Sequence, residues 1–230
     1  MIIRWSELPE TLRRPEVKNY YKRLYRRRGS LLIKRGFDIA ASLIMILLLA
    51  PVMLGVAVWI KLDSKGPVFF RQERITQYGR RFRIFKFRTM VTDAEQLGTL
   101  VTVEEDPRIT KVGKKIRSKR LDELPQLFNI LAGDMTFVGT RPEVLKYVEY
   151  YRPEWMATLL LPAGVTSSAS VAYKDEDAVM QSYREKGYSV DEIYTRYILP
   201  EKMRYNLEEL RSFSLWHDVK ILVRTVLAVI

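Results

Sequence analysis

One long apolar stretch limits what this chain can fold into more than any other feature. It runs from Phe37 to Ile60, and from Ile39 onward it carries no charged side chain. A helix of roughly 20 apolar residues can cross the hydrocarbon core of a bilayer. The alternative, a buried helix of a soluble protein, rarely has so long an uncharged run. The stretch begins too far along the chain and is too long for a cleaved signal peptide. We therefore expect a membrane-inserted helix.

The flanks of this stretch indicate how it meets the membrane. Basic residues lie on both sides of it: Lys22, Arg23, Arg26, Arg27, Arg28, Lys34 and Arg35 before it, and Lys61, Lys65, Arg71, Arg74, Arg80 and Arg81 after it. Basic flanks favour the cytoplasmic side, near anionic headgroups. Pro51 breaks or kinks a helix, and Asp38 is costly in hydrocarbon unless it is paired. These features predict a re-entrant helix that turns at Ala50-Pro51 and returns to the same face. An ordinary tilted span is the alternative.

Two further segments have the composition of interfacial helices. The stretch Arg13–Arg28 mixes tyrosines with basic residues, a combination suited to the membrane interface, although a solvated basic helix would look similar. The stretch Ser214–Ile230 has a broad apolar face with Asp218, Lys220 and Arg224 along the other side. It predicts either a core helix or a second interfacial helix.

Composition excludes several kinds of chemistry. The chain has no cysteine and one histidine, His217, so thiolate metal sites, cysteine nucleophiles and multi-histidine sites are excluded. Catalysis would rest on carboxylates, Lys and Arg, hydroxyls or an oxygen-ligated metal. The net charge of +12 indicates an anionic partner. Nucleic acid is disfavoured, because no nucleic-acid-binding motif accompanies the basic residues.

The polar part of the chain predicts an α+β fold that is mainly helical. Val68–Ile75 and Arg81–Phe87 read as short strands around Gln77-Tyr78-Gly79, which predicts a β-hairpin. The basic stretch Thr110–Arg120 predicts a helix. The full expectation is a monotopic membrane protein with a re-entrant helix-break-helix and interfacial amphipathic helices.

A carboxylate pair, Asp122-Glu123, directly follows the basic helix. Asp122 is a good N-cap for a helix whose residues Leu124, Leu127, Phe128 and Leu131 share one face. A helix start and nearby cations favour an ionised carboxylate and an anion site. Read locally, the pair favours a simple cap and first-turn charge over catalysis. The loop Gly133–Glu143 follows, and its glycines and Arg141 could hold a phosphate.

The order of the motifs is more specific than any one of them. They are Lys34-Arg35-x-x-Asp38, the apolar stretch broken by Pro51, Gly66-Pro67-Val68-Phe69-Phe70, Lys86-Phe87-Arg88-Thr89-Met90, Leu121-Asp122-Glu123-Leu124-Pro125-Gln126 and Gly139-Thr140-Arg141-Pro142. This series resembles the bacterial sugar transferase family, the monotopic polyprenyl-phosphate phosphoglycosyl transferases. The resemblance covers about residues 34–145, with a weaker trace to the C-terminus.

The resemblance implies an activity and a set of site residues. It implies transfer of a sugar 1-phosphate from a UDP-sugar to undecaprenyl phosphate, with release of UMP and the start of a lipid-linked glycan such as exopolysaccharide, capsule or O-antigen. Asp122 would be the nucleophile, forming an aspartyl-phosphosugar, and Glu123 a general base or a metal-positioning group. Asp122 and Glu123 would hold Mg²⁺. The substrate-binding residues would be Arg117, Arg141, Arg88, Lys174 and Asp175.

The resemblance also implies a location and a division of the chain. The enzyme would lie on the cytoplasmic face of the bacterial inner membrane, in contact with membrane lipids. Its parts would be a basic interfacial segment (1–36), the re-entrant helix (37–60), a catalytic core (61–145) and a C-terminal substrate-contacting part (146–230). Thr140 stands where the family commonly has proline, and Gly164–Lys174 departs from the family pattern. The sugar therefore stays open. The alternatives are a non-catalytic membrane-bound basic adaptor and a glycosyltransferase that releases UDP.

Overall fold

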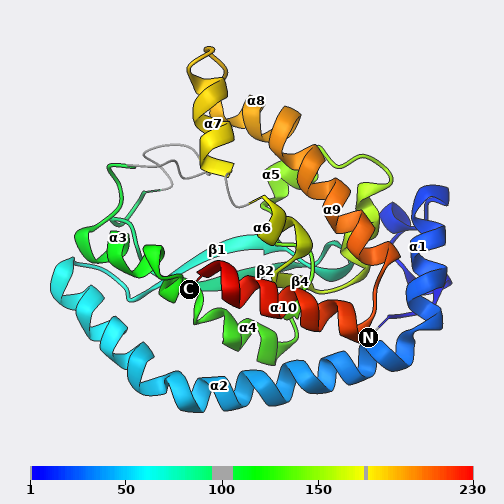
Figure 1. Ribbon diagram of the computed structural model, residues 1–230, viewed down its shortest axis with the longest axis horizontal. Coiled ribbons are helices and arrows are strands. Elements are labelled where there is room, and N and C mark those ends of the chain that lie inside the picture. The colour runs from blue at the N-terminus through cyan, green and yellow to red at the C-terminus, as the bar shows by residue number, and fades with distance from the viewer. Residues whose placement is uncertain (1, 95–105, 174–175, 230) are drawn as a thin grey trace.

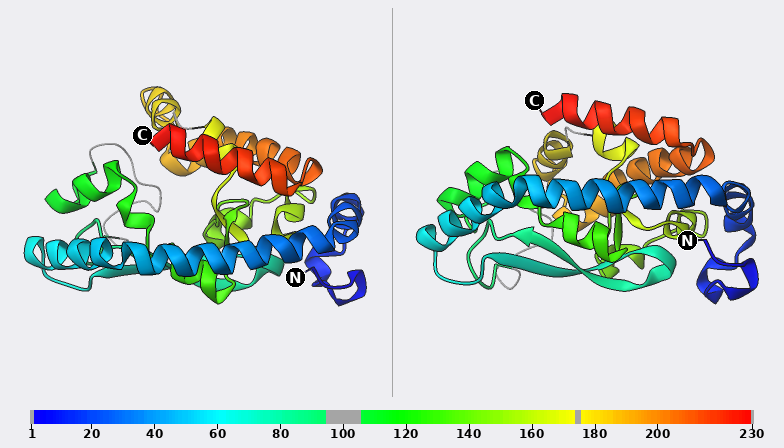
Figure 2. Two further views of the ribbon diagram at one scale, coloured as in Figure 1. Left: turned by 60° about the horizontal axis from the view of Figure 1, so that its bottom comes forward. Right: turned by 90° about the horizontal axis from the view of Figure 1, so that it is seen from below.

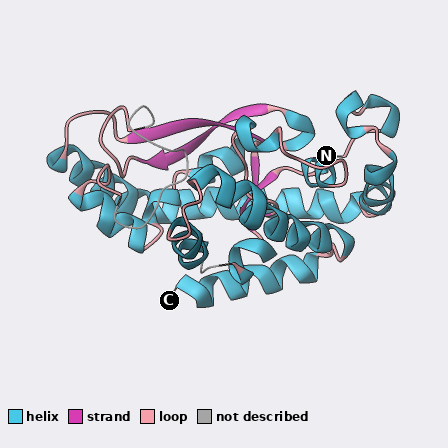
Figure 3. Cartoon of the chain, turned by 90° about the horizontal axis from the view of Figure 1, so that it is seen from above, coloured by secondary structure: helices cyan, strands magenta, loops and turns pink. Residues whose placement is uncertain are grey.

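The computed structural model describes residues 2–94, 106–173 and 176–229. Helices surround two small sheets (Figures 1 and 3). The helices are α1 Pro15–Arg26, α2 Arg28–Asp63, α3 Lys111–Ser118, α4 Gln126–Ala132, α5 Leu145–Val148, α6 Ser168–Ala172, α7 Glu176–Arg184, α8 Val190–Ile193, α9 Leu199–Arg211 and α10 Leu215–Val229. The strands are β1 Phe69–Ile75, β2 Arg81–Phe87, β3 Met135–Val138 and β4 Ala163–Thr166. The predicted mainly helical α+β class is confirmed.

Helix α2 contains the whole apolar stretch and continues through Pro51. Figure 1 shows that it bends along its length, so that its C-terminal part rises toward α3. Proline removes a backbone hydrogen bond and crowds the preceding turn, which explains a bend in this region. The predicted break into two helices is wrong for this structure, because the helical backbone is uninterrupted. The return of both flanks to one membrane face stays a prediction.

Most of the apolar surface of α2 faces outward. Within the described ranges, it is the helix long and apolar enough to cross a membrane, and only 17% of its most apolar window is buried. The large apolar side chains left exposed are Leu32, Ile33, Phe37, Ile39, Leu43, Ile44, Met45, Leu47, Leu48, Val52, Leu54, Val58, Trp59 and Leu62. A core helix of a soluble protein would bury such residues. An exposed apolar surface of this extent indicates contact with a membrane or a partner.

The tyrosine-rich face of α1 packs into the protein. Val17, Tyr20, Tyr21 and Leu24 are all buried in the largest hydrophobic core, which also includes residues of the 3₁₀ helix Trp155–Leu160 and of α9. The prediction that the tyrosines of this segment lie at the membrane interface is therefore wrong. An amphipathic pattern specifies that one face is buried, but it does not specify whether protein or lipid covers that face.

Strands β1 and β2 form the predicted antiparallel hairpin, with Phe69 opposite Phe87 and Ile75 opposite Arg81. The predicted basic helix is also present as α3, with Thr110 as its N-cap. A second sheet, the parallel pair β3 and β4, has no counterpart in the sequence-based expectation. Its pairing joins segments that are separated by a long connection, which local patterns do not reveal.

Helix α10 lies beside α2 and exposes much of its apolar surface. Both views in Figure 2 show the two helices running in roughly the same direction. The Lys34 ammonium on α2 forms a buried ion pair with Asp218 on α10, at 2.5 Å. Ile221 is buried, whereas Trp216, Val219, Val223, Val226 and Leu227 are exposed. Of the two expectations for this segment, the exposed apolar side chains favour the interfacial helix.

Candidate active site

A cavity of about 900 Å³ lies between α2, α3, α4, α9 and α10. Four of the predicted site residues line it: Arg117, Asp122, Glu123 and Arg141. Lys86 from β2 also lines it. The structure therefore brings together side chains from segments that are well separated in the sequence. The cavity combines the carboxylates of Asp122, Glu123, Glu143 and Glu176 with several cations.

Asp122 lies in a single 3₁₀ turn, Leu121–Glu123, just before α4. The expected role of Asp122 as N-cap is wrong, because Pro125 occupies that position. The predicted apolar face is also only partly right: Leu127 is buried, but Phe128 is exposed. Proline suits the start of a helix because its missing N–H needs no partner there. Asp122 therefore does not cap α4, and it lines the cavity instead.

The Asp122 carboxylate is buried and incompletely hydrogen-bonded. Its side chain belongs to a residue that is 7% exposed, and its Oδ1 has no hydrogen-bond partner among the described residues. Burial raises the pKa of Asp122, and Glu123 raises it further, while Lys86, Arg117 and Arg141 lower it. A carboxylate with a raised pKa is more basic, and therefore more nucleophilic, once it is ionised. Unpaired buried polar groups are uncommon and call for an explanation.

Glu123 has a different environment, although it is the next residue. Its Oε1 accepts a hydrogen bond from Lys86 Nζ at 3.0 Å, and Arg141 donates to both of its carboxylate oxygens. Burial alone would raise the pKa of Glu123, but Arg141 and Lys86 hold this pKa well below its ordinary value. Glu123 is therefore a fixed anion that positions two cations at the cavity.

The parallel sheet positions Arg141. Gly139 N donates to Thr166 O at 2.9 Å, and Gly164 N donates to Thr140 O at 2.8 Å. The two backbones approach so closely that a Cβ on Gly164 would lie 2.1 Å from Gly139 O. Glycine is needed here because any side chain would push the strands apart. The sheet thus fixes the loop from which Arg141 reaches Glu123.

Arg117 lies in the last turn of α3 and completes the cationic wall. The hydroxyl of Thr110 accepts a hydrogen bond from Gly113 N at 2.9 Å and so caps the start of this helix. Among the described residues, none accepts a hydrogen bond from the Arg117 guanidinium. A half-buried arginine without a fixed protein partner is suited to binding an anionic ligand.

Of the other predicted substrate-binding residues, the structure describes only Arg88, and it is not found at the cavity. Arg88 is buried, and its guanidinium donates to the carbonyls of Ser64 and Lys65, at 2.8 and 2.5 Å. It therefore holds the segment that follows α2, and it does not line the cavity. Lys174 and Asp175 lie outside the described residues.

The sequence-based reasoning assigned no site role to several polar residues that line the cavity, among them Lys86, Gln126 and Asn206. Lys86 and Gln126 both lie inside motifs that were recognised, and their position there was the available signal. Asn206 interrupts the buried face of α9, between Met203 and Leu210. A polar residue within an apolar helical stripe would have been the signal for it.

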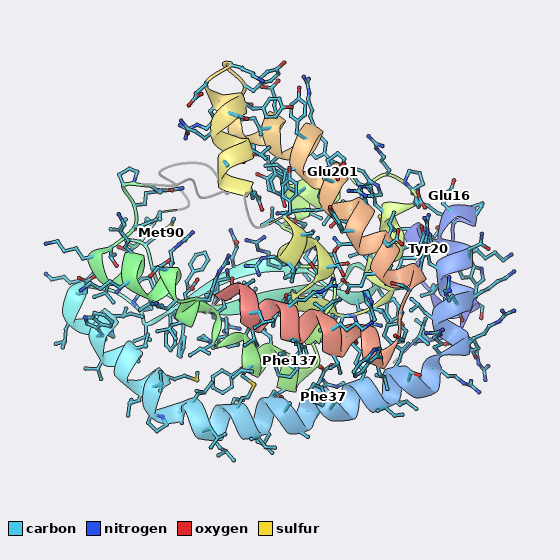
Figure 4. The ribbon with its side chains drawn as sticks, viewed as in Figure 1. Glu16, Tyr20, Phe37, Met90, Phe137 and Glu201 are labelled. Atoms are coloured by element: carbon cyan, nitrogen blue, oxygen red, sulfur yellow. The ribbon has the colours of Figure 1, made fainter. Side chains whose placement is uncertain are left out.

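The start of α2 is fastened to the walls of this cavity. Asp38 accepts hydrogen bonds from Thr136 Oγ1 at 2.7 Å and from Phe137 N at 3.2 Å. Arg35 donates to the carbonyls of Ile130 and Leu131 at the end of α4. Figure 4 shows Phe37 and Phe137 facing each other, with ring centroids 6.1 Å apart. Asp38 therefore has the polar partners that an aspartate at the start of an apolar helix requires.

In chemical terms, the cavity is a site for an anion beside a nucleophile. Lys86, Arg117 and Arg141 supply positive charge, and Glu123 fixes two of these three cations. Asp122 contributes an oxygen, Oδ1, to which none of the described residues donates a hydrogen bond. At its other end, the cavity is lined by Met45 of α2 and by Leu222, Val226 and Ala228 of α10, so it also has an apolar border.

Comparisons with known proteins agree with this geometry. Residues 29–230 match the model of a family described as bacterial sugar transferase. The chain is 41% identical over 197 residues to a UDP-N-acetylgalactosamine-undecaprenyl-phosphate N-acetylgalactosaminephosphotransferase of Aeromonas hydrophila, covering 84% of this chain and 43% of the relative. It is 37% identical over 203 residues to an undecaprenyl-phosphate glucose phosphotransferase of Komagataeibacter xylinus (85% and 35%). It is 34% identical over 200 residues to a UDP-glucose:undecaprenyl-phosphate glucose-1-phosphate transferase of Escherichia coli K12 (85% and 39%). The chain thus spans less than half the length of these relatives.

Proposed function

This chain belongs to the bacterial sugar transferase family, and on that premise we propose that it transfers a sugar 1-phosphate from a UDP-sugar to undecaprenyl phosphate. The observation that carries this proposal is the unpartnered Asp122 oxygen in a cavity lined by Lys86, Arg117 and Arg141. A diphosphate needs cations, and a covalent route needs a free nucleophile. Both requirements are met by described side chains.

In the first step, an Asp122 carboxylate oxygen attacks the phosphorus that carries the sugar. A new O–P bond forms, and the bond from this phosphorus to the bridging diphosphate oxygen breaks. UMP leaves with the bonding electron pair. Lys86, Arg117 and Arg141 neutralise the charge that gathers on the phosphate oxygens, as cations do in other phosphoryl transfers. Glu123 keeps Lys86 and Arg141 in position throughout.

In the second step, an ionised oxygen of undecaprenyl phosphate attacks the same phosphorus. The Asp122–phosphorus bond breaks, the carboxylate is restored, and a lipid-linked diphosphate sugar is formed. This attack needs no general base, because the lipid phosphate oxygen is already deprotonated. Splitting the transfer into two displacements is covalent catalysis. The apolar border formed by Met45, Leu222 and Val226 is suited to the lipid end of the acceptor.

A divalent cation fits the donor chemistry of this cavity. Mg²⁺ prefers oxygen ligands and is commonly held by one or two carboxylates together with substrate phosphates. One oxygen of the Asp122 carboxylate can be such a ligand while the other attacks phosphorus, whereas both oxygens of Glu123 already accept hydrogen bonds from Arg141 or Lys86. We therefore propose that Asp122 and the diphosphate would hold Mg²⁺, with Glu123 alongside. The ion would supply further charge neutralisation at the phosphates.

We expect the nucleotide released to be UMP. Purified protein would be incubated with Mg²⁺, undecaprenyl phosphate and each of UDP-N-acetylgalactosamine, UDP-N-acetylglucosamine, UDP-glucose and UDP-galactose, and the nucleotides would be separated by chromatography. UMP formation that depends on the lipid acceptor supports the proposal. Release of UDP would indicate an ordinary glycosyltransferase. The absence of any released nucleotide across the panel would favour the non-catalytic adaptor.

We propose that α2 inserts into the cytoplasmic leaflet and that the cavity opens toward the cytoplasm. The exposed apolar surfaces of α2 and α10 support membrane contact, and the basic residues on both flanks of α2 support a cytoplasmic position for both ends. This arrangement lets one cavity receive a soluble nucleotide sugar and a lipid phosphate at headgroup level.

Cysteine labelling tests this topology, because the chain has no cysteine of its own. Single cysteines would replace Lys22, before α2, and the exposed Leu62, near its end. We expect a membrane-impermeant maleimide to label both positions in inside-out vesicles and neither position in intact spheroplasts. The opposite outcome would be labelling of position 62 in intact spheroplasts but not in inside-out vesicles. That result would show that α2 is an ordinary transmembrane span.

A further inference from the structure

Two amide side chains on α4, Gln126 and Asn129, are buried to the same degree, at 1% exposure each. Asn129 is fully engaged: its Oδ1 accepts a hydrogen bond from Phe85 N at 2.8 Å, and its Nδ2 donates to Arg83 O at 3.0 Å. It joins α4 to β2. Gln126 differs, because neither its Oε1 nor its Nε2 has a partner among the described residues.

The unsatisfied amide of Gln126 works against the stability of the fold. A buried donor or acceptor without a partner loses its hydrogen bonds to water and gains none in return. An apolar side chain of similar size would pack at this position without that cost. Residues that break a local rule in this way are expected mainly at functional sites. Gln126 also lines the cavity that contains Asp122, so a ligand in the cavity can supply the missing partners.

The chemistry of the first displacement indicates which part of a ligand lies near Gln126. Gln126 is the first residue of α4, which begins shortly after the 3₁₀ turn that contains Asp122, and both residues line the cavity. In an in-line displacement, the leaving group departs opposite the nucleophile. The leaving UMP therefore lies on the far side of the phosphorus from Asp122. The sugar remains bonded to that phosphorus through an oxygen in the equatorial plane, which lies nearer to Asp122 than the departing UMP does and can come within reach of Gln126.

The kinds of side chain lining the cavity agree with this assignment. The cations Lys86, Arg117 and Arg141 are suited to the charged diphosphate. An amide is neutral and offers both donors and an acceptor, which suits the hydroxyl or acetamido groups of a sugar. A second unpartnered amide oxygen, that of Asn206 on α9, lines the cavity as well. The cavity thus has uncharged polar groups in addition to its phosphate-binding cations.

We propose that Gln126 binds the sugar group of the UDP-sugar and positions it beside Asp122. This inference rests on the proposed function, because it assumes that Asp122 attacks the sugar-bearing phosphorus. The Gln126 amide hydrogen-bonds the sugar while the phosphates lie on the cations. Gln126 is buried at 1% exposure, so its amide is shielded from water and can hold the sugar in one orientation.

The variant Gln126→Met separates this role from a structural one, with Asn129→Leu as the matched control. Methionine is similar in length and has no strong hydrogen-bonding group. Three quantities would be measured for each protein: the melting temperature, the dissociation constants of the four UDP-sugars, and the dissociation constant of UMP. We expect Gln126→Met to melt at or above the wild-type temperature and to bind the preferred UDP-sugar about tenfold or more weakly, with UMP binding unchanged. Asn129→Leu should melt at a lower temperature.

The results also distinguish this inference from the proposed function. A parallel loss of UMP affinity in Gln126→Met would overturn the inference, since the amide would then contact the nucleotide. A lower melting temperature with unchanged UDP-sugar affinity would overturn it too, since the role would be structural. If the wild type binds UDP-sugars but releases no UMP with any donor, the proposed function fails. The difference in sugar affinity between wild type and Gln126→Met would still decide whether the amide contacts the sugar.

Discussion

Replacing Asp122 with asparagine is expected to reduce turnover by about a thousandfold or more, as loss of a covalent nucleophile does in other enzymes. Asparagine has nearly the same shape, so the cavity and the membrane-binding surfaces should persist. Because Asp122 Oδ1 has no hydrogen-bond partner among the described residues, the fold loses no contact of that atom. The measurements are UMP release, and the mass of the protein after incubation with a UDP-sugar alone. The wild type should gain the mass of a phosphosugar, and the variant should not.

Asp134→Asn is a suitable control for this experiment. Asp134 pairs with Arg80 at 2.8 Å and does not line the cavity. We expect its variant to form the covalent adduct at the wild-type rate. Adduct formation by Asp122→Asn, or turnover close to that of the wild type, would remove Asp122 from the role of nucleophile.

Replacing Lys34 with methionine is expected to have the largest effect on stability. The change leaves Asp218 buried without its partner, and removal of one member of a buried pair costs about 3–5 kcal/mol. For a chain of this size, that loss corresponds to a fall in melting temperature of roughly 6–20 °C. The melting temperature would be measured in detergent or nanodiscs. A change of only a degree or two would contradict the prediction.

The pH dependence and a double variant test the same pair. Burial raises the pKa of Asp218, and Lys34 opposes this rise, so loss of Lys34 should raise the pKa further. A folded-state pKa above the unfolded value means that stability increases as the pH falls through the interval between the two values. The deficit of Lys34→Met should therefore shrink toward acidic pH. Adding Asp218→Leu should recover most of the lost stability, since no buried charge then remains.

Local sequence patterns predicted the elements that depend on local interactions. The hairpin β1–β2 follows from alternating side chains around Gln77-Tyr78-Gly79, and α3 follows from its own composition and cap. The parallel pair β3–β4 could not be predicted in this way, because its contacts join distant segments. The tyrosine face of α1 was assigned to the membrane and lies in the core. Lipid and protein interior favour the same apolar pattern, so the sequence does not distinguish them.

The candidate site shows a similar division. The motif order identified Asp122, Glu123, Arg117 and Arg141, and the structure places all four around one cavity. Only the structure distinguishes the two carboxylates as candidate nucleophiles. Both Glu123 oxygens accept hydrogen bonds, whereas Asp122 Oδ1 has no partner among the described residues. Arg88 was assigned to substrate from the resemblance of the motif in which it lies, yet its guanidinium donates to the carbonyls of Ser64 and Lys65. Residue type indicates what a side chain can bind, but only the three-dimensional arrangement decides which partner it meets.

The two faces of α2 should tolerate mutation very differently. On the outward face, Leu47, Leu48 and Leu54 need only remain apolar, so random mutagenesis should recover many interchangeable residues there. On the inward face, Lys34 and Asp38 make specific polar contacts, and these sites should accept few replacements. A deep mutational scan would then show tolerance rising and falling about once per helical turn. The sequence of the inward face of α2 is therefore constrained by specific contacts, whereas that of the outward face is constrained only to remain apolar.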